Sequence, residues 1–291
     1  MKKFVLIAAL IAEVAVAQGL QTPYRDDVGP TLIGGVPANP AEWPASVYAR
    51  MGNGACSATV IGERSLLIAS HCVSNGGAAS FTVGGNAYGS VCTHAPGYPA
   101  NSTYDWSLCL ISRPVTGIKY ESVALANPGV SIGKTLRLTG YGCIRSGGGG
   151  GNDGVFRIGN APVTGLPGTG SNADIVTRGR AALCYGDSGG AAYLEKEDGS
   201  RSIVGVNSRG DISTTSYLPA LYHPTFVSFA KSWTTAKAVK VCGMHADAPS
   251  CRDADEVPPP PPSDCQGELS DHETAIGAAV ATMKTLKACV Q

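Results

Sequence analysis

The segment Cys184-Tyr-Gly-Asp-Ser-Gly-Gly190 places a serine between glycines, which allow the backbone a tight turn. On such a turn the hydroxyl of Ser188 is exposed and neighbouring backbone N–H groups converge on one point. Hydrolysis of an acyl bond needs this geometry, because the tetrahedral intermediate carries negative charge on an oxygen. A Gly-Asp-Ser-Gly stretch alone is commonly only a turn, so its interpretation depends on partners elsewhere in the chain.

Two further segments supply those partners. Ala69-Ser-His-Cys72 places His71 at the end of an apolar run, and Asp105 opens another apolar run that continues to Ile111. A histidine can take the proton of a serine, and a carboxylate can hold the imidazole in the required tautomer. Alone, His71 would be a structural histidine and Asp105 a strand cap. Their joint occurrence in the order His71, Asp105, Ser188 favours a catalytic triad.

Composition limits both the architecture and the partners. The 291 residues suffice for one large domain or two small ones, and a hydrophobic fraction of 43% with only 15% charged residues excludes wholesale disorder. Glycine contributes 38 residues, and short β-rich runs broken by turn residues fill positions 32–225, which predicts an all-β fold. A helical spacing follows at 226–240. The 22 basic and 22 acidic residues cancel, so no nucleic-acid partner is expected.

The beginning of the chain predicts secretion. Residues 1–17 have a basic start, an apolar stretch and an Ala-Val-Ala end, as in a signal peptide, and the stretch is too short for a membrane anchor. Residues 18–31 then form a leader or pro-segment. Ten cysteines are typical of disulfide bonds in an oxidising compartment. We therefore expect an extracellular protein, or a periplasmic one in a Gram-negative host.

Three more motifs occur along the chain, in a fixed order relative to the residues of the triad. They are Leu32-Ile-Gly-Gly35, Thr139-Gly-Tyr-Gly142 and Asn207-Ser-Arg-Gly210. With these, residues 32–241 resemble the chymotrypsin-like serine endopeptidases. The resemblance implies two six-stranded antiparallel β-barrels with the active site between them, followed by a C-terminal helix. It also implies a protein or peptide substrate, an acyl-enzyme intermediate, and neither a cofactor nor a metal.

The resemblance assigns further roles around Ser188. The backbone N–H groups of Gly186 and Ser188 would form the oxyanion hole, and Ser208 would hydrogen-bond near Asp105. Asp187 would pair with the α-amino group of Leu32 once the leader is removed. Here the chain departs from the family pattern, because no Lys or Arg directly precedes Leu32. Either a protease unlike trypsin cuts there, or the mature N-terminus lies elsewhere.

Substrate preference follows from the expected pocket. By resemblance Ala182 lies at its base, with Leu183, Ser208, Gly210 and either Ala220 or Tyr222 around it. Ala182 supplies no acid to meet Lys or Arg, so we expect cleavage after apolar or aromatic residues. Arg209 stands where the family has a tryptophan, which alters the platform for the neighbouring substrate side chains.

The cysteines divide into three groups. The resemblance implies a Cys56–Cys72 bridge around the histidine loop and suggests Cys143–Cys184, because these segments run close together in the family fold. A Cys92–Cys109 bridge would tie the strands beside Asp105. The remaining four cysteines allow three pairings, and the sequence leaves the choice open. They are Cys242, Cys251, Cys265 and Cys289.

The C-terminal part has a different composition. Residues 242–264 form a Cys/Pro-rich linker, and 265–291 a small helical tail that either docks on the protease domain or binds a partner. A zinc site at Cys242, His245, Cys251 and His272 is disfavoured by secretion. We expect a monomeric enzyme. The alternative is a catalytically silent protease homologue that acts as a binding protein.

Overall fold

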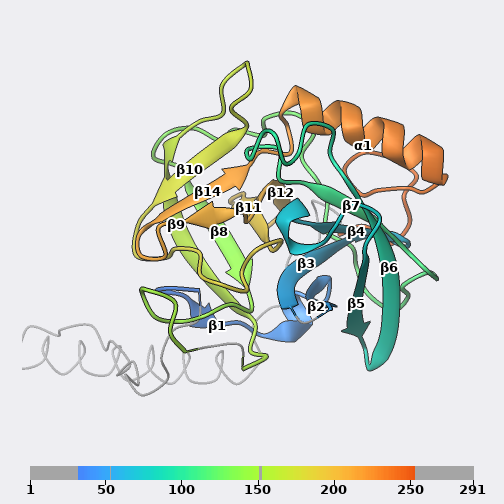
Figure 1. Cartoon of the computed structure of the whole chain (residues 1–291), viewed down its shortest axis with the longest axis horizontal. Coiled ribbons are helices and arrows are strands. Elements are labelled where there is room, and N and C mark those ends of the chain that lie inside the picture. The colour runs from blue at the N-terminus through green and yellow to red at the C-terminus, as the bar shows by residue number, and fades with distance from the viewer. Residues whose placement is uncertain (1–31, 53, 151–152, 253–291) are drawn as a thin grey trace, which may run out of the picture.

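The computed structural model describes residues 32–52, 54–150 and 153–252 (Figure 1). Its first half is a closed antiparallel barrel in the order β2-β3-β4-β7-β6-β5. The strands are β2 (Ser46–Met51), β3 (Gly54–Gly62), β4 (Ser65–Ile68), β5 (Ala78–Val83), β6 (Asn86–His94) and β7 (Ser107–Ile111). In β5 exposed and buried residues alternate strictly, as expected for a strand with one face in the core.

The second half is an eight-stranded sheet in the order β12-β11-β8-β9-β10-β14-β13, with β1 paired to β9. Its strands are β1 (Val36–Pro37), β8 (Thr135–Gly140), β9 (Arg157–Gly165), β10 (Asp174–Arg178), β11 (Ala191–Glu195), β12 (Arg201–Val206), β13 (Arg209–Gly210) and β14 (Thr215–Pro219). An isolated bridge between Gly205 and Ala220 brings β12 back to the end of β14. The sheet therefore curls into a ring, and β1 and β13 are short additions to the six strands that the sequence predicted.

The described residues also form two short 3₁₀ helices, η1 (Pro40–Glu42) and η2 (Ser70–Cys72), and the α-helix α1 (Pro224–Lys237). Helix α1 lies close to the predicted range of 226–240. The His223 side chain caps its first turn by accepting a hydrogen bond from the Thr225 N–H, and Ala238 ends it in the left-handed conformation. The all-β architecture with a C-terminal helix is thus confirmed.

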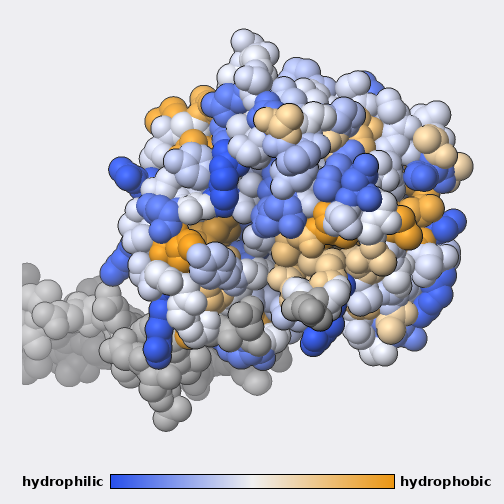
Figure 2. Space-filling view, viewed as in Figure 1, coloured by the Kyte–Doolittle hydropathy of each residue, from blue (hydrophilic) through white to orange (hydrophobic). Residues whose placement is uncertain are grey.

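One hydrophobic cluster joins the two halves. It contains Leu67 and Trp106 from the first barrel, Tyr193 and Ile203 from the second, and Phe226 from α1. Burial of apolar surface across this junction fixes the relative position of the halves, and hence the geometry of any site between them. On the face shown in Figure 2, the surface is mostly hydrophilic and the apolar residues form small separate patches.

Four disulfides occur among the described residues, and they include the three predicted ones, Cys56–Cys72, Cys92–Cys109 and Cys143–Cys184. The fourth, Cys242–Cys251, answers part of the question that the sequence left open. The other two cysteines of that group, Cys265 and Cys289, lie outside the described residues.

The first part of the expected linker packs on the first barrel. The Cys242 N–H donates to the carbonyl of Ile61, and Cys251 forms a parallel bridge with Tyr120. Residues 242–252 are therefore part of the folded unit, whereas the predicted signal peptide, the predicted leader, the proline run and the predicted helical tail lie outside the described residues. Within the described part of the chain, no helix is long and apolar enough to cross a membrane.

Candidate active site

His71 lies in η2, directly after strand β4, and two links fix this turn. The buried Ser70 hydroxyl donates to the carbonyl of Trp106 at 2.6 Å, and the Cys56–Cys72 disulfide ties the following residue to β3. The imidazole itself is exposed, with 37% of the side-chain surface accessible. A fixed backbone under an accessible ring suits a residue that exchanges protons with a bound molecule.

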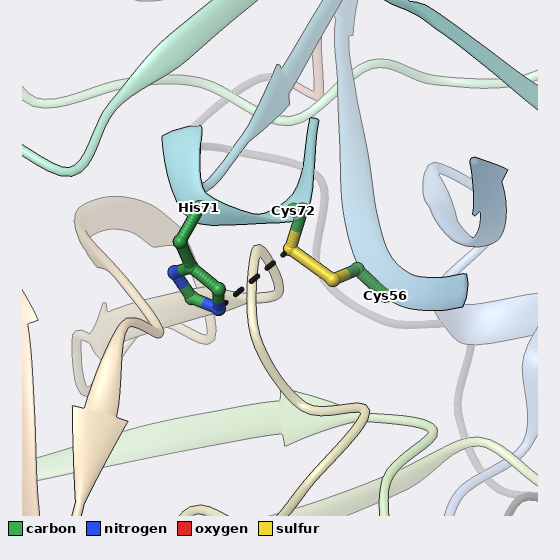
Figure 3. Close-up of side chains that lie close together, drawn as sticks. All are labelled: Cys56, His71 and Cys72. Atoms are coloured by element: carbon green, nitrogen blue, oxygen red, sulfur yellow. Dashed lines mark hydrogen bonds between the residues drawn. A yellow bond between two sulfur atoms is a disulfide. The ribbon is translucent and has the colours of Figure 1, made fainter. Parts of the chain in front are cut away.

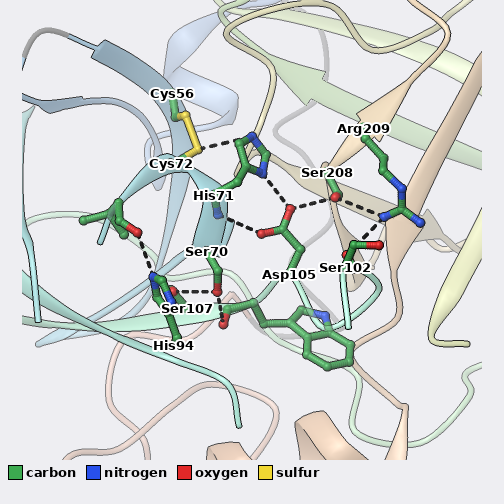
Figure 4. Close-up of polar contacts among 12 residues, drawn as sticks. Cys56, Ser70, His71, Cys72, His94, Ser102, Asp105, Ser107, Ser208 and Arg209 are labelled. Atoms are coloured by element: carbon green, nitrogen blue, oxygen red, sulfur yellow. Dashed lines mark hydrogen bonds and ion pairs between the residues drawn. A yellow bond between two sulfur atoms is a disulfide. The ribbon is translucent and has the colours of Figure 1, made fainter. Parts of the chain in front are cut away.

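Asp105 meets His71 through both carboxylate oxygens (Figure 4). Nδ1 of His71 lies 2.6 Å from Oδ2, and the backbone N–H of His71 donates to Oδ1 at 2.8 Å. The hydroxyl of Ser208 donates to Oδ2 at 2.7 Å. Burial raises the pKa of Asp105, but the hydrogen bonds from His71 and Ser208 and the charge of His71 outweigh it and hold the pKa below its usual value. Asp105 is thus an ionised carboxylate that orients the ring.

Ser188 sits on a turn that packs against the first barrel. Its carbonyl accepts a hydrogen bond of 2.9 Å from the N–H of Ser57. Gly189 has φ +81°, and a Cβ there would lie 2.3 Å from the Ser57 oxygen and 3.1 Å from the Ala69 nitrogen, so only glycine allows this approach. The Ser188 hydroxyl is half-buried and makes no hydrogen bond within the described part of the chain. The turn thus brings Ser188 to the segment that carries His71.

The backbone around Gly186 and Ser188 leaves two donors free. Neither N–H has an acceptor among the described residues, whereas the intervening Asp187 N–H donates to the Cys184 carbonyl at 3.1 Å. The Tyr185 carbonyl accepts from the N–H of Cys143 at 2.8 Å. Because C=O and N–H point in opposite directions across a trans peptide, this bond turns the Gly186 N–H away from Cys143. The N–H groups of Gly186 and Ser188 are therefore available to a bound molecule, as the donors of an oxyanion hole must be.

Asp187 is completely buried, and its carboxylate accepts hydrogen bonds from two segments of the chain. One oxygen accepts from the Gly142 N–H and the other from the Cys184 N–H, each at 2.9 Å. Burial raises the pKa of Asp187 to about 7 despite these bonds. Leu32, whose α-amino group is the predicted partner of Asp187, is fully buried. It packs in the hydrophobic cluster of the second half, which also contains Ala181. The structure is that of the uncleaved chain, so the ion pair with a Leu32 α-amino group stays a prediction.

Gly210, which the sequence analysis assigned to the substrate pocket, lies opposite a residue that the sequence analysis did not name. Gly210 pairs with Ser216 across β13 and β14, and the Ser216 hydroxyl accepts a hydrogen bond of 3.0 Å from the Leu183 N–H. Ala220 instead lies fully buried in the core, with its N–H donating to the Ala173 carbonyl. Ser216 is thus the residue opposite Gly210, and the sequence missed it because the loop after Gly210 could not be aligned.

The other residues that the sequence analysis assigned to the pocket lie in two segments. Ala182 and Leu183 are buried just before the turn of Ser188, and Ala182 forms an antiparallel bridge with Ile33. Ser208 and Gly210 flank Arg209 on the strand that leads away from Asp105. Their role in a substrate pocket stays a prediction.

Arg209, at the position where the family has a tryptophan, forms an ion pair with Asp174. Its guanidinium contacts the Asp174 carboxylate, donates to the Ser102 carbonyl at 3.2 Å and lies 5.0 Å from the ring centre of Tyr217. Figure 4 shows it next to Ser208, on the side away from His71. A charged side chain thus occupies this position, where the sequence analysis expected an altered platform for substrate side chains.

One cluster has the geometry of a metal site but not the chemistry. The ligand atoms of Cys56, His71 and Cys72 lie within 4.8 Å of one another (Figure 3). The two sulfurs are bonded to each other, so neither is a thiolate, and only a single imidazole nitrogen remains. The cluster is instead the histidine loop and its disulfide, with Nε2 of His71 at 3.9 Å from the Cys72 sulfur.

Two comparisons with known proteins bear on the family of the chain. The profile of the family described as Trypsin matches residues 32–233. A trypsin-like protease of Streptomyces glaucescens is 27% identical over 247 residues, which covers 76% of this chain and 87% of that protein.

Proposed function

The chain belongs to the trypsin family of serine proteases, and from this premise we propose that His71, Asp105 and Ser188 form its catalytic triad. The contact of Asp105 with both the ring and the backbone of His71, at 2.6 and 2.8 Å, carries the proposal. It fixes Nδ1 as the protonated nitrogen and leaves Nε2 free to accept a proton.

The reaction then follows from the residues of the cleft. Ser188 attacks the scissile carbonyl while Nε2 of His71 takes its proton. The N–H groups of Gly186 and Ser188 stabilise the oxyanion, and His71 returns the proton to the leaving amine. The ionised Asp105 stabilises the imidazolium throughout. Water activated by His71 hydrolyses the acyl-enzyme and restores Ser188.

We also propose how the enzyme reaches this state. A signal peptide of residues 1–17 directs export and is then removed, and cleavage before Leu32 releases the α-amino group that pairs with Asp187. The protease domain spans 32–241, and the tail at 265–291 docks on it or binds a partner. The enzyme acts as a monomer.

Ala182 and Leu183 make the pocket apolar, which favours substrates with an apolar or aromatic residue before the scissile bond. A digest of an unfolded protein, with the new termini identified by mass spectrometry, tests both activity and preference. We expect cleavage mainly after Leu, Phe and Tyr, and none with Ser188→Ala. Cleavage mostly after Lys or Arg would refute the preference, and equal digestion by Ser188→Ala would refute the triad.

A further inference from the structure

The hairpin of β2 and β3 presents a mixed aromatic and cationic face beside the oxyanion hole. Tyr48 lies opposite Ser57 and Arg50 opposite Ala55 in the strand register, so these four side chains share one face of the hairpin. The Ser57 hydroxyl donates to the Gly186 carbonyl at 2.8 Å. This face therefore adjoins the turn that carries Ser188.

A cavity of about 390 Å³ occupies the space between the hairpin and this turn. Its lining residues are Tyr48, Arg50, Gly52, Gly54, Ala55, Tyr185 and Gly186. The glycines leave its walls open, and the ring of Tyr185, 63% exposed, forms part of its rim. A substrate side chain can enter such a space without rearrangement of the backbone.

The position of His71 identifies which part of a substrate reaches this cavity. Its Nε2 faces the Cys56–Cys72 disulfide, and this nitrogen must deliver a proton to the leaving amine (Figure 3). The leaving amine therefore lies on the disulfide side of Ser188. Ala55, which lines the cavity, directly precedes Cys56. The chain after the scissile bond runs past the disulfide into the cavity, whereas the chain before it follows the Ser208–Gly210 edge.

Arg50 supplies the selective charge of the cavity. Its side chain is exposed, its guanidinium lies 5.2 Å from the ring centre of Tyr48, and it has no carboxylate partner among residues 32–52, 54–150 and 153–252. A guanidinium with free donors binds a carboxylate through two parallel hydrogen bonds. We infer that Arg50 selects substrates with an aspartate or glutamate within the first residues after the scissile bond. This inference rests on the proposed protease activity.

Quenched fluorescent peptides with amidated C-termini test the inference. They share one sequence up to a leucine before the scissile bond and carry Asp, Ala or Lys at each of the next two positions. With the processed full chain we expect kcat/KM to be about tenfold higher for the best Asp peptide than for its Lys counterpart, and the ratio to shrink in 0.5 M salt. Arg50→Ala should remove the preference and Arg50→Glu reverse it, whereas Arg50→Lys should retain part of it.

Lys231→Ala is the matched control, because it removes one exposed positive charge on α1, away from the cavity. It should leave the Asp/Lys ratio unchanged. If wild type and Arg50→Glu cut all peptides with the same ratios, the inference is wrong while the protease activity stands. If wild type cuts none of the peptides, including the Ala peptide, both the proposed function and the inference are overturned.

Discussion

The hydroxyl of Ser208 donates a hydrogen bond of 2.7 Å to Oδ2 of Asp105, the same oxygen that lies 2.6 Å from Nδ1 of His71. Ser208 lies between β12 and β13 of the second half, whereas His71 and Asp105 belong to the first barrel. The bond therefore crosses the junction between the halves. It lets the second half position a carboxylate that the first half supplies.

Loss of this bond should weaken catalysis without affecting substrate binding. We expect Ser208→Ala to lower kcat by about 10- to 150-fold with little change in KM, because a hydrogen bond to a charged group contributes about 1.5–3 kcal/mol. The exposed Ser228→Ala on α1 serves as the control and should retain wild-type kcat. A rise in KM at unchanged kcat would show that Ser208 contacts substrate instead of positioning Asp105.

Neutralising Asp105 should have a much larger effect. Asp105→Asn keeps the shape of the side chain but removes the charge that stabilises the His71 imidazolium and selects its tautomer. We expect kcat to fall about 10⁴-fold while the melting temperature changes little. Steady-state kinetics and a thermal melt check this, and activity within tenfold of wild type would exclude Asp105 from the triad.

Asp187 should make the stability of the uncleaved chain depend on pH. Its pKa is about 7 in the folded chain, above the ordinary value of 3.8, so the folded state binds the proton more tightly. The stability that this group contributes is fully present below pH 3.8 and is lost as the pH rises through about 7.

Urea unfolding of Ser188→Ala, which cannot digest itself, measures this contribution between pH 4 and 8. Relative to the double variant with Asp187→Asn, its free energy of unfolding should fall as the pH rises. The asparagine adds only a constant offset, since its amide cannot accept both backbone hydrogen bonds. Parallel curves for the two proteins would contradict a raised pKa at Asp187.

A buried ion pair anchors the segment 242–252. The fully buried Glu121 accepts a hydrogen bond of 3.0 Å from Nε of Arg201 and lies 3.5 Å from Nε of Arg252. We expect Glu121→Ala to lower the free energy of unfolding by about 3–5 kcal/mol, because the largely buried Arg201 and the half-buried Arg252 lose their counter-charge.

The control is Glu195→Ala, which breaks the partly exposed pair with Arg137 at 2.8 Å. It should cost less than about 1 kcal/mol. Denaturant titration measures both variants. Equal costs would mean that the Glu121 cluster is no more than a surface pair.

The sequence predicted the parts of the site that short motifs carry. His71, Asp105 and Ser188 each stand in a recognisable segment, and Asp105 indeed contacts both His71 and Ser208. The bridges Cys92–Cys109 and Cys143–Cys184 were predictable because each joins segments whose order in the fold was expected. The resemblance named Gly186 and Ser188 as backbone donors, but not the bond from the Cys143 N–H to the Tyr185 carbonyl that turns the Gly186 N–H away from Cys143.

Features that depend on strand register or on contacts between distant segments escaped prediction. The register of β13 and β14 places Ser216 opposite Gly210, and no local pattern fixes that register across a loop of unaligned length. Likewise Cys242 and Cys251 stand in a stretch with the composition of a linker. Their burial against the first barrel depends on a bridge to Tyr120, which lies far away in the sequence.

The central claim is that Ser188 is a nucleophile activated by His71 and Asp105, and covalent labelling tests it most directly. The processed chain is treated with a fluorophosphonate, digested, and the modified residue is located by mass spectrometry. We predict a single adduct on Ser188 in the wild type, a strongly slowed reaction in Asp105→Asn and none in Ser188→Ala. A wild-type protein that stays unlabelled, or one labelled equally after Ser188→Ala, would contradict the account.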